Sequence, residues 1–124
     1  MDYQKAQSSY LANQILSASP NRLIEILLEN AIKQTKIASI MLEKQQLAET
    51  HKHLIKAQEI VTELDYSLNH EEGGEIADNL AQLYRFVYQR LVDANVSKEA
   101  TGIQEAQKIL EELLETWQTV TADS

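Results

Sequence analysis

Two apolar stripes run along the segment from Leu54 to Leu68, which contains neither Gly nor Pro. At about 100° per residue, an α-helix places residues three and four apart on one face. Ile55 and Tyr66, about three helical turns apart, share one face with Glu59 and Thr62 between them. The roughly opposite face has the spacing of a helix buried along one side, and it carries Leu54, Ala57, Val61, Leu64 and Leu68. The latter stripe predicts a core, and the former needs a separate explanation.

A second pair of stripes follows Ser19-Pro20, which is a typical helix start. Ser19 can accept hydrogen bonds from the first free amides, and Pro loses nothing at the first helical position. The pattern predicts a helix from Pro20 to about Glu43. Its expected core stripe is Ile24, Leu27, Ala31, Ala38 and Leu42, with Leu28 at the edge. Another side of the same helix carries Ile26, Ile37 and Ile40.

Two further helices are expected in the second half of the chain. After a polar link at 44–48, the helix that holds Leu54 should run to about Asn69, where His70–Gly74 breaks it. The next helix should run from about Glu75 to Asn95, with an inner face of Ile76, Leu80, Leu83, Tyr84, Val87 and Leu91. Thr101 and Gln104 have capping-box spacing and predict the last helix start. Its expected core residues are Ile103, Ala106, Leu110, Leu113, Trp117 and Val120.

Four long amphipathic helices joined by short links predict an all-α fold, an antiparallel four-helix bundle with an additional short N-terminal helical segment. The 124 residues are enough for one domain. We expect residues 1–17 to form either a frayed tail or a strap that lies on the body and can be displaced, residues 18–121 to form the bundle, and residues 122–124 to be a loose C-terminus.

Charge and composition narrow the class of protein. A net charge of −8 argues against a nucleic-acid binder, which needs a basic stripe. The chain has no Cys, and so no disulfide or thiolate metal site. The first residues lack the apolar region of a signal peptide, and no apolar run is long enough to cross a bilayer. We therefore expect a cytoplasmic protein without membrane insertion.

Catalytic signatures are missing from the sequence. It contains no Gly-rich phosphate loop, nucleophile elbow or Cys–His pair, and no Glu lies three residues before a His, as di-iron bundles require. His51 and His53 point to different sides of a helix and cannot chelate one metal. We expect a non-enzymatic protein with no cofactor or metal. The alternative is a histidine phosphotransfer domain that uses His53 and Lys56, although Ala57 replaces the expected Gly.

The second apolar stripes are the main functional clue. A soluble monomer seldom leaves such surface bare; it covers the surface or uses it. Residues 1–17 could cover one face permanently, a homodimer could form through it, or an amphipathic helix of another protein could dock there.

The run Leu54–Ile60, followed by Glu63-Leu64 and Ser67-Leu68-Asn69, resembles the third helix of the FliS family of flagellin-specific export chaperones. Other matching pieces occur in the same order: Ala18-Ser19-Pro20, Leu83-Tyr84, Arg90-Leu91-Val92 and Trp117. The resemblance implies a chaperone that binds the disordered C-terminal segment of flagellin, prevents its premature polymerisation and aids flagellar type III export. Components of the export apparatus and a homodimer remain open as partners.

The resemblance and the outer stripes together indicate a partner-binding surface. In the family, the N-terminal tyrosine-bearing segment can occupy part of this surface, and Tyr10 is the matching position. We expect the binding residues to be Tyr10, Leu11, Ile37, Ile40, Ile55, Glu59, Thr62 and Tyr66. The chain departs from the family pattern at Leu27–Ala31 and at Gln34 and Thr35, where relatives commonly have other residues. These departures concern contacts of the first long helix more than the fold.

Overall fold

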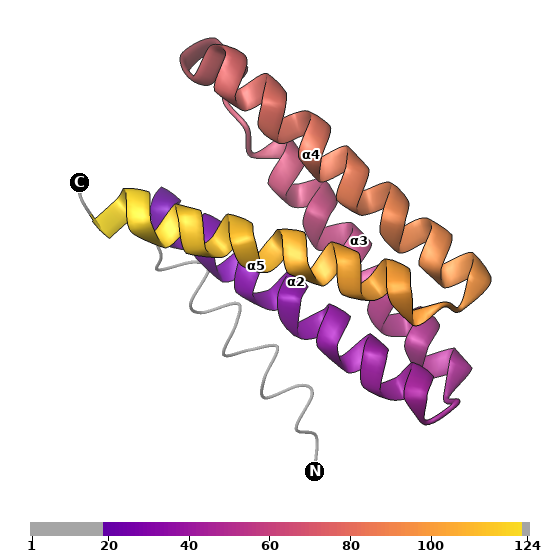
Figure 1. The fold of residues 1–124 in the computed structure, drawn as a ribbon. Helices are drawn as coiled ribbons and strands as arrows, with labels where there is room; N and C mark the ends of the chain where they lie inside the picture. The colour runs from indigo at the N-terminus through magenta and orange to yellow at the C-terminus, as the bar shows by residue number, and fades with distance from the viewer. Residues whose placement is uncertain (1–18, 123–124) are drawn as a thin grey trace.

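The structure is a computed structural model, and it describes residues 19–122. These residues form helices α2 (Pro20–Glu43), α3 (Leu47–Tyr66), α4 (His70–Ser97) and α5 (Ala100–Ala122), without strands. The predicted all-α fold is confirmed. Consecutive helices run in opposite directions, as Figure 1 shows.

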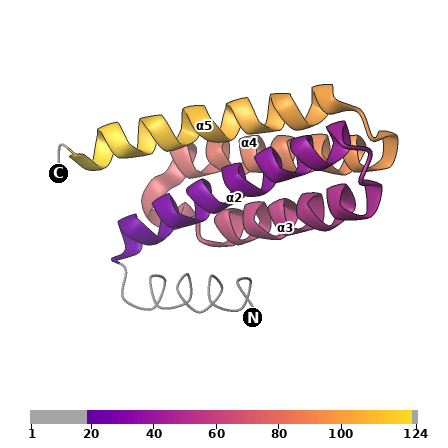
Figure 2. The same ribbon diagram turned by 90° about the horizontal axis from the view of Figure 1, so that it is seen from below.

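The four helices pack as a ring. Each helix contacts the next one along the chain, and α5 closes the ring against α2. Figure 2 shows α2 between α5 and α3, with α4 behind. Because every helix therefore has two neighbours, each one buries a wider arc than a single stripe.

The start of α2 agrees with the sequence pattern. Ser19 is the N-cap residue, and its Oγ accepts a hydrogen bond from the Arg22 amide at 3.3 Å. Pro20 follows at the first helical position. The side-chain oxygen thus satisfies one of the amides that a helix start leaves free.

The start of α4 has the expected break at Gly74 and, before it, a short capped turn that the sequence pattern did not predict. Asn69 caps a helical turn that begins at His70, because its Oδ1 accepts from the Glu72 amide at 3.1 Å. The helix kinks at Gly74, whose φ of 52° and ψ of −124° are non-helical. L-residues with a side chain rarely adopt a positive φ, so Gly permits the kink. The helix is therefore interrupted at Gly74, within the predicted break, and its long part begins at about Glu75 as expected.

The core confirms the stripe on α3 and corrects the one on α2. Leu54, Ala57, Val61 and Leu64 are fully buried in α3, and Leu68 packs against the core after the helix ends. On α2, Leu28 was expected at the edge but belongs to the core cluster. Ile26 was expected on the outer stripe, yet it is only 3% exposed.

The start of α5 also differs from expectation. The helix begins at Ala100, so Thr101 lies within its first turn and is not the residue before it. At the other end α5 continues through Ala122. Ile103, Ala106 and Leu110 are buried as predicted, and Leu113 and Trp117 pack against the core.

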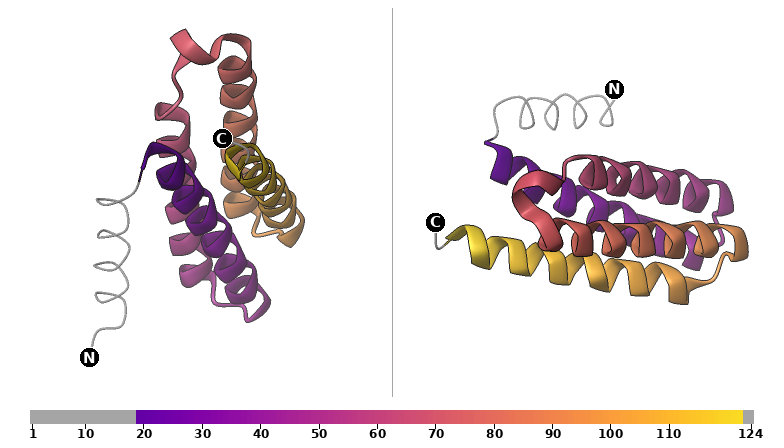
Figure 3. Two further views of the ribbon diagram at one scale, coloured as in Figure 1. Left: turned by 90° about the vertical axis from the view of Figure 1, so that its left-hand side faces the viewer. Right: turned by 90° about the horizontal axis from the view of Figure 1, so that it is seen from above.

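Helices α4 and α5 are close at one end and apart at the other. Near the α4–α5 connection, a Cβ added to Gly102 would come within 2.9 Å of the Ala94 Cβ. Toward the α3–α4 connection, the helices diverge, as Figure 1 and the left panel of Figure 3 show. Ile76 and Val120, both expected in the core, are 71% and 62% exposed there. Helical periodicity missed this because it assumes that a partner helix stays within reach.

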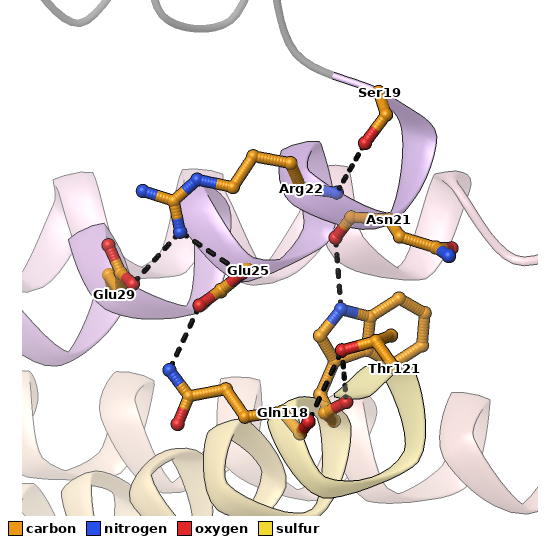
Figure 4. A network of polar contacts seen from close by, with 8 residues as sticks. Ser19, Asn21, Arg22, Glu25, Glu29, Gln118 and Thr121 are labelled. Atoms are coloured by element: carbon orange, nitrogen blue, oxygen red, sulfur yellow. Dashed lines mark hydrogen bonds and ion pairs between the residues drawn. The ribbon is translucent and has the colours of Figure 1, made fainter. Parts of the chain in front are cut away.

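Polar contacts join α2 to α5 where the ring closes (Figure 4). Trp117 Nε1 donates to the Asn21 carbonyl at 2.9 Å, and Gln118 Nε2 donates to Glu25 Oε1 at 2.9 Å. Arg22 lies 3.0 Å from the Glu25 carboxylate. The Gln118 hydrogen bond, aided by Arg22, lowers the pKa of Glu25. The first and last described helices are therefore linked by directional bonds as well as by packing.

Candidate partner-binding groove

A pocket of about 310 Å³ lies in the outer seam between α3 and α4. Helix α3 contributes one wall and α4 contributes the other, because the two helices pack side by side in opposite directions. The lining residues are Val61, Thr62 and Asp65 from α3, with Tyr84, Arg85, Tyr88 and Gln89 from α4. The pocket therefore combines an apolar base, two aromatic rings and a polar edge.

The two tyrosines lie at different depths. Tyr84 belongs to the core cluster and is 5% exposed, whereas Tyr88 is 38% exposed. Burial, together with the charge of Asp65, raises the pKa of Tyr84 to about 12. Its hydroxyl consequently stays protonated and uncharged at neutral pH. Tyr88 offers a ring that is apolar on its face and polar at its tip, a combination favoured at interfaces.

An ion pair lies at the polar edge. Arg85 Nε is 3.7 Å from Asp65 Oδ2, and the arginine side chain is 69% exposed. Exposed pairs at such distances contribute little to stability, so both groups can exchange partners at small cost.

The predicted α3 residues share the outward side of the helix. Ile55 is half-buried, Glu59 and Thr62 are exposed, and Tyr66 is 84% exposed. Among them, Thr62 lines the pocket. Its hydroxyl donates to the Gln58 carbonyl at 3.0 Å and is thus already occupied within the helix. Tyr66 lies one residue beyond Asp65 along the same seam.

The helix register extends the seam beyond the pocket. Asp65 faces Arg85, and the His51 Nδ1 accepts from Asn95 Nδ2 at 2.9 Å near the other end of α3. Residues seven positions before Thr62 must therefore face residues about seven positions after Tyr88. This places Ile55 level with Val92 and Val96 of α4, of which Val96 is 83% exposed. We call the seam that runs from Tyr66 through the pocket to Ile55 the α3–α4 groove.

The remaining predicted residues lie elsewhere. Ile37 is half-buried and Ile40 is 48% exposed, both on α2. Helix α2 packs on the side of α3 opposite to α4 in the ring, so these two residues do not join the α3–α4 groove. Tyr10 and Leu11 lie outside the described residues.

The α4 wall was missed by reasoning from sequence. Tyr84, Arg85, Tyr88 and Gln89 line the pocket, but the sequence pattern predicts only a core position for Tyr84 and no groove role for any of the four. The available signal was the wide apolar arc of α4, on which Phe86, Tyr88 and Val92 fall outside the core stripe. Which helix α4 would face could not be read from that arc.

The two histidines of α3 contact different helices. His53 Nδ1 donates to Gln34 Oε1 of α2 at 2.6 Å, and its Nε2 lies 3.6 Å from Glu49 Oε2. His51 instead bonds to Asn95 of α4. Burial, followed by the charge of Lys56, lowers the pKa of His53. A side chain that is 12% exposed and bonded between helices does not suit a phosphate acceptor, which must be reached by another protein.

Residues 19–122 contain neither a candidate metal centre nor a candidate membrane span. No three His, Cys, Asp or Glu side chains come together there in a way that could hold a metal ion. No helix of this part is long and apolar enough to span a bilayer. A four-helix bundle with a tyrosine-lined pocket between two of its helices has the shape of groove into which an amphipathic helix can fit.

Comparison with known proteins gives the family. The family model described as flagellar protein FliS matches residues 2–124. The flagellar secretion chaperone FliS of Salmonella typhimurium is 35% identical, over 86% of this chain and 80% of its own length. FliSB of Pseudomonas aeruginosa is 32% identical over 87% and 86%, and FliS of Bacillus subtilis 26% identical over 94% and 86%. The chain belongs to the FliS family.

Proposed function

We propose that this chain is a cytoplasmic, non-enzymatic export chaperone that binds the C-terminal segment of flagellin in the α3–α4 groove. The relatives are named flagellar secretion chaperones, which supports the chaperone role. The observation that carries the groove is the pocket between α3 and α4, where Thr62 and Tyr88 meet on the outer surface. The groove continues along exposed Tyr66 and half-buried Ile55.

The physical logic favours a segment that folds as it binds. A groove between two antiparallel helices fits a third helix, whose apolar residues at spacings of three and four would contact the seam. A disordered segment spends ordering entropy on binding, which keeps the complex releasable. A bound segment cannot assemble with other flagellin copies, so capture and delayed polymerisation are one event.

Calorimetric titration tests the proposal with a synthetic peptide that covers the last ~40 residues of the flagellin from the same organism, a segment length that suits coupled folding. Circular dichroism of the mixture should show more helix than the sum of the separate components. Absence of binding, with the peptide still disordered, would remove flagellin as the partner.

Substitutions in the α3–α4 groove test whether the flagellin peptide binds there. Ile55→Glu should lower the affinity for the flagellin peptide by about tenfold or more, since it places a charge against an apolar segment. Tyr88→Ala should weaken it by several-fold through loss of the ring. The matched control is Phe86→Ala on the far side of α4, which removes a 51% exposed ring outside the groove and should leave affinity unchanged.

Helicity of all three variants should equal that of the parent chain, because none of the substituted side chains is fully buried. Equal affinity for Ile55→Glu, Tyr88→Ala and the parent would move the binding surface away from α3 and α4. If the parent chain binds the peptide and the variants bind it equally well, flagellin remains the partner but the α3–α4 groove is not its binding site.

A further inference from the structure

The ends of α4 and α5 that diverge form a second candidate surface, distinct from the α3–α4 groove. Arg90 of α4 pairs with Glu105 of α5, and Ala94 faces Gly102, which sets the register of the two antiparallel helices. Continued along the same register, Ile76 of α4 lies level with Val120 of α5. If the axes of α4 and α5 stayed at the same separation along their whole length, these two side chains would pack together.

Instead, both side chains are largely exposed. Ile76 is 71% exposed and Val120 62%, while Leu83 and Leu113, closer to the contact, are half-buried. Figure 1 shows the start of α4 well apart from the end of α5. Each helix thus presents an apolar face that its neighbour leaves unpartnered. We call this pair of faces the α4–α5 mouth.

The charge around the mouth specifies what could cover it. The half of the bundle that contains the mouth, residues 19–29, 63–85 and 109–122, carries eleven acidic side chains and two basic ones. The other half, residues 30–62 and 86–108, carries six acidic and eight basic side chains. Both basic groups near the mouth already have carboxylate partners: Arg22 pairs with Glu25 and Glu29, and Arg85 with Asp65.

We propose that the α4–α5 mouth binds an amphipathic helix with a basic polar face, supplied by a protein other than the flagellin segment. The apolar side of such a helix would cover Ile76 and Val120, and its lysines or arginines would meet Glu75 of α4 and Glu112 of α5, which lie about 100° and 80° around their helices from those two residues. The uneven charge of the bundle would also orient the partner before contact, because a field of one sign steers charged ligands.

The test uses a fluorescent peptide of leucine and lysine with helical period, about five turns long, and the full chain. A leucine–glutamate peptide of the same pattern controls for charge, and a scrambled leucine–lysine peptide controls for composition. Binding is followed by fluorescence anisotropy. The leucine–lysine peptide should bind most tightly, and its affinity should fall as salt is raised from about 0.05 to 0.5 M.

Two double variants separate the mouth from the rest of the acidic surface. Ile76→Ser with Val120→Ser should weaken the leucine–lysine peptide by about tenfold, which corresponds to about 1.4 kcal/mol. Phe86→Ser with Leu47→Ser removes two exposed apolar groups that lie outside both the mouth and the α3–α4 groove, each 51% exposed, and should have no effect. The flagellin peptide should bind equally to both double variants, so failure of the mouth and failure of the groove are distinguishable.

Equal weakening by both double variants, or by neither, would overturn the proposal, as would equal binding of the scrambled peptide. A photo-crosslinking residue at position 120 identifies the occupant. Crosslinks to the peptide support the proposal. Crosslinks to residues 1–18, or a dimer that Ile76→Ser abolishes in sedimentation, would assign the mouth to this chain itself and overturn it.

Discussion

At the scale of single residues, the two sides of α3 differ between adjacent positions. Val61 is 1% exposed and belongs to the core, whereas Thr62 is exposed and bonds only to its own helix. The same substitution at these two positions therefore separates stability from binding.

Val61→Glu should unfold the bundle, because an unpaired buried carboxylate costs about 3–5 kcal/mol or more. Thermal denaturation followed by circular dichroism measures the loss. The control is Thr62→Glu, which should remain folded and lose partner affinity only. A folded Val61→Glu protein would mean that the inner and outer faces of α3 have been reversed.

His53 predicts a pH dependence of stability. Its pKa is lowered in the folded chain from the ordinary value of 6.5, chiefly by burial, so the folded state prefers the neutral ring. Below pH 6.5 the unfolded chain binds a proton that the folded chain resists, and the free energy of unfolding must fall. Glu25, whose pKa is lowered from its ordinary 4.5, affects the free energy of unfolding only at more acidic pH, where the unfolded chain binds a proton more readily than the folded chain.

We therefore expect the free energy of unfolding to decrease from about pH 7 to pH 5, as measured by urea denaturation. His53→Gln should remove most of this slope while it keeps a group that can donate to Gln34. A slope that persists unchanged in the variant would show that other groups cause it.

At the scale of elements, sequence reasoning succeeded where signals are local. Ser19-Pro20 marks the start of α2 through chemistry contained within one helical turn, and the stripe from Leu54 to Leu64 reports a face that is covered along its whole length. The prediction that Ile76 lies in the core was wrong for the opposite reason, since the exposure of Ile76 depends on where α5 lies. The α4 residues of the groove could not be predicted for the same reason, because residues such as Arg85 line the groove only when α4 is placed beside α3.

The kink in α4 gives a prediction about an element. Nothing lies within 4 Å of a Cβ added at Gly74, so Gly74→Ala meets no steric obstacle, only the backbone penalty of its positive φ. This penalty should cost about 1–3 kcal/mol of stability. Chemical denaturation measures it. A synthetic chain with D-alanine at position 74 should recover stability, because the mirror image of φ 52° and ψ −124° is an ordinary extended conformation. Equal loss with D-alanine would rule out a backbone cause.

At the scale of the whole molecule, ring closure between α2 and α5 joins the parts of the bundle that are furthest apart in sequence. The other three helix contacts are between neighbours along the chain. The closing seam is tied by the Trp117 indole on the Asn21 carbonyl and by Gln118 on Glu25.

Trp117→Phe should lower the free energy of unfolding by about 1 kcal/mol, since it removes that hydrogen bond while it keeps an aromatic ring. Urea denaturation followed by circular dichroism measures the change. Gln118→Ala, which removes an exposed bond from the next residue, should cost much less. Equal stability of Trp117→Phe and the parent would show that the seam depends on packing alone.

The same seam brings the beginning of α2 and the end of α5 together, with Asn21 and Trp117 in direct contact. A bundle whose first and last described helices meet in this way is suited to circular permutation. A short linker from α5 to Ser19, with new termini opened in the 44–46 link between α2 and α3, would keep every helix and every helix contact. In such a permutant residues 1–18 no longer have to precede α2. That segment could therefore be attached at another position and studied as an independent part.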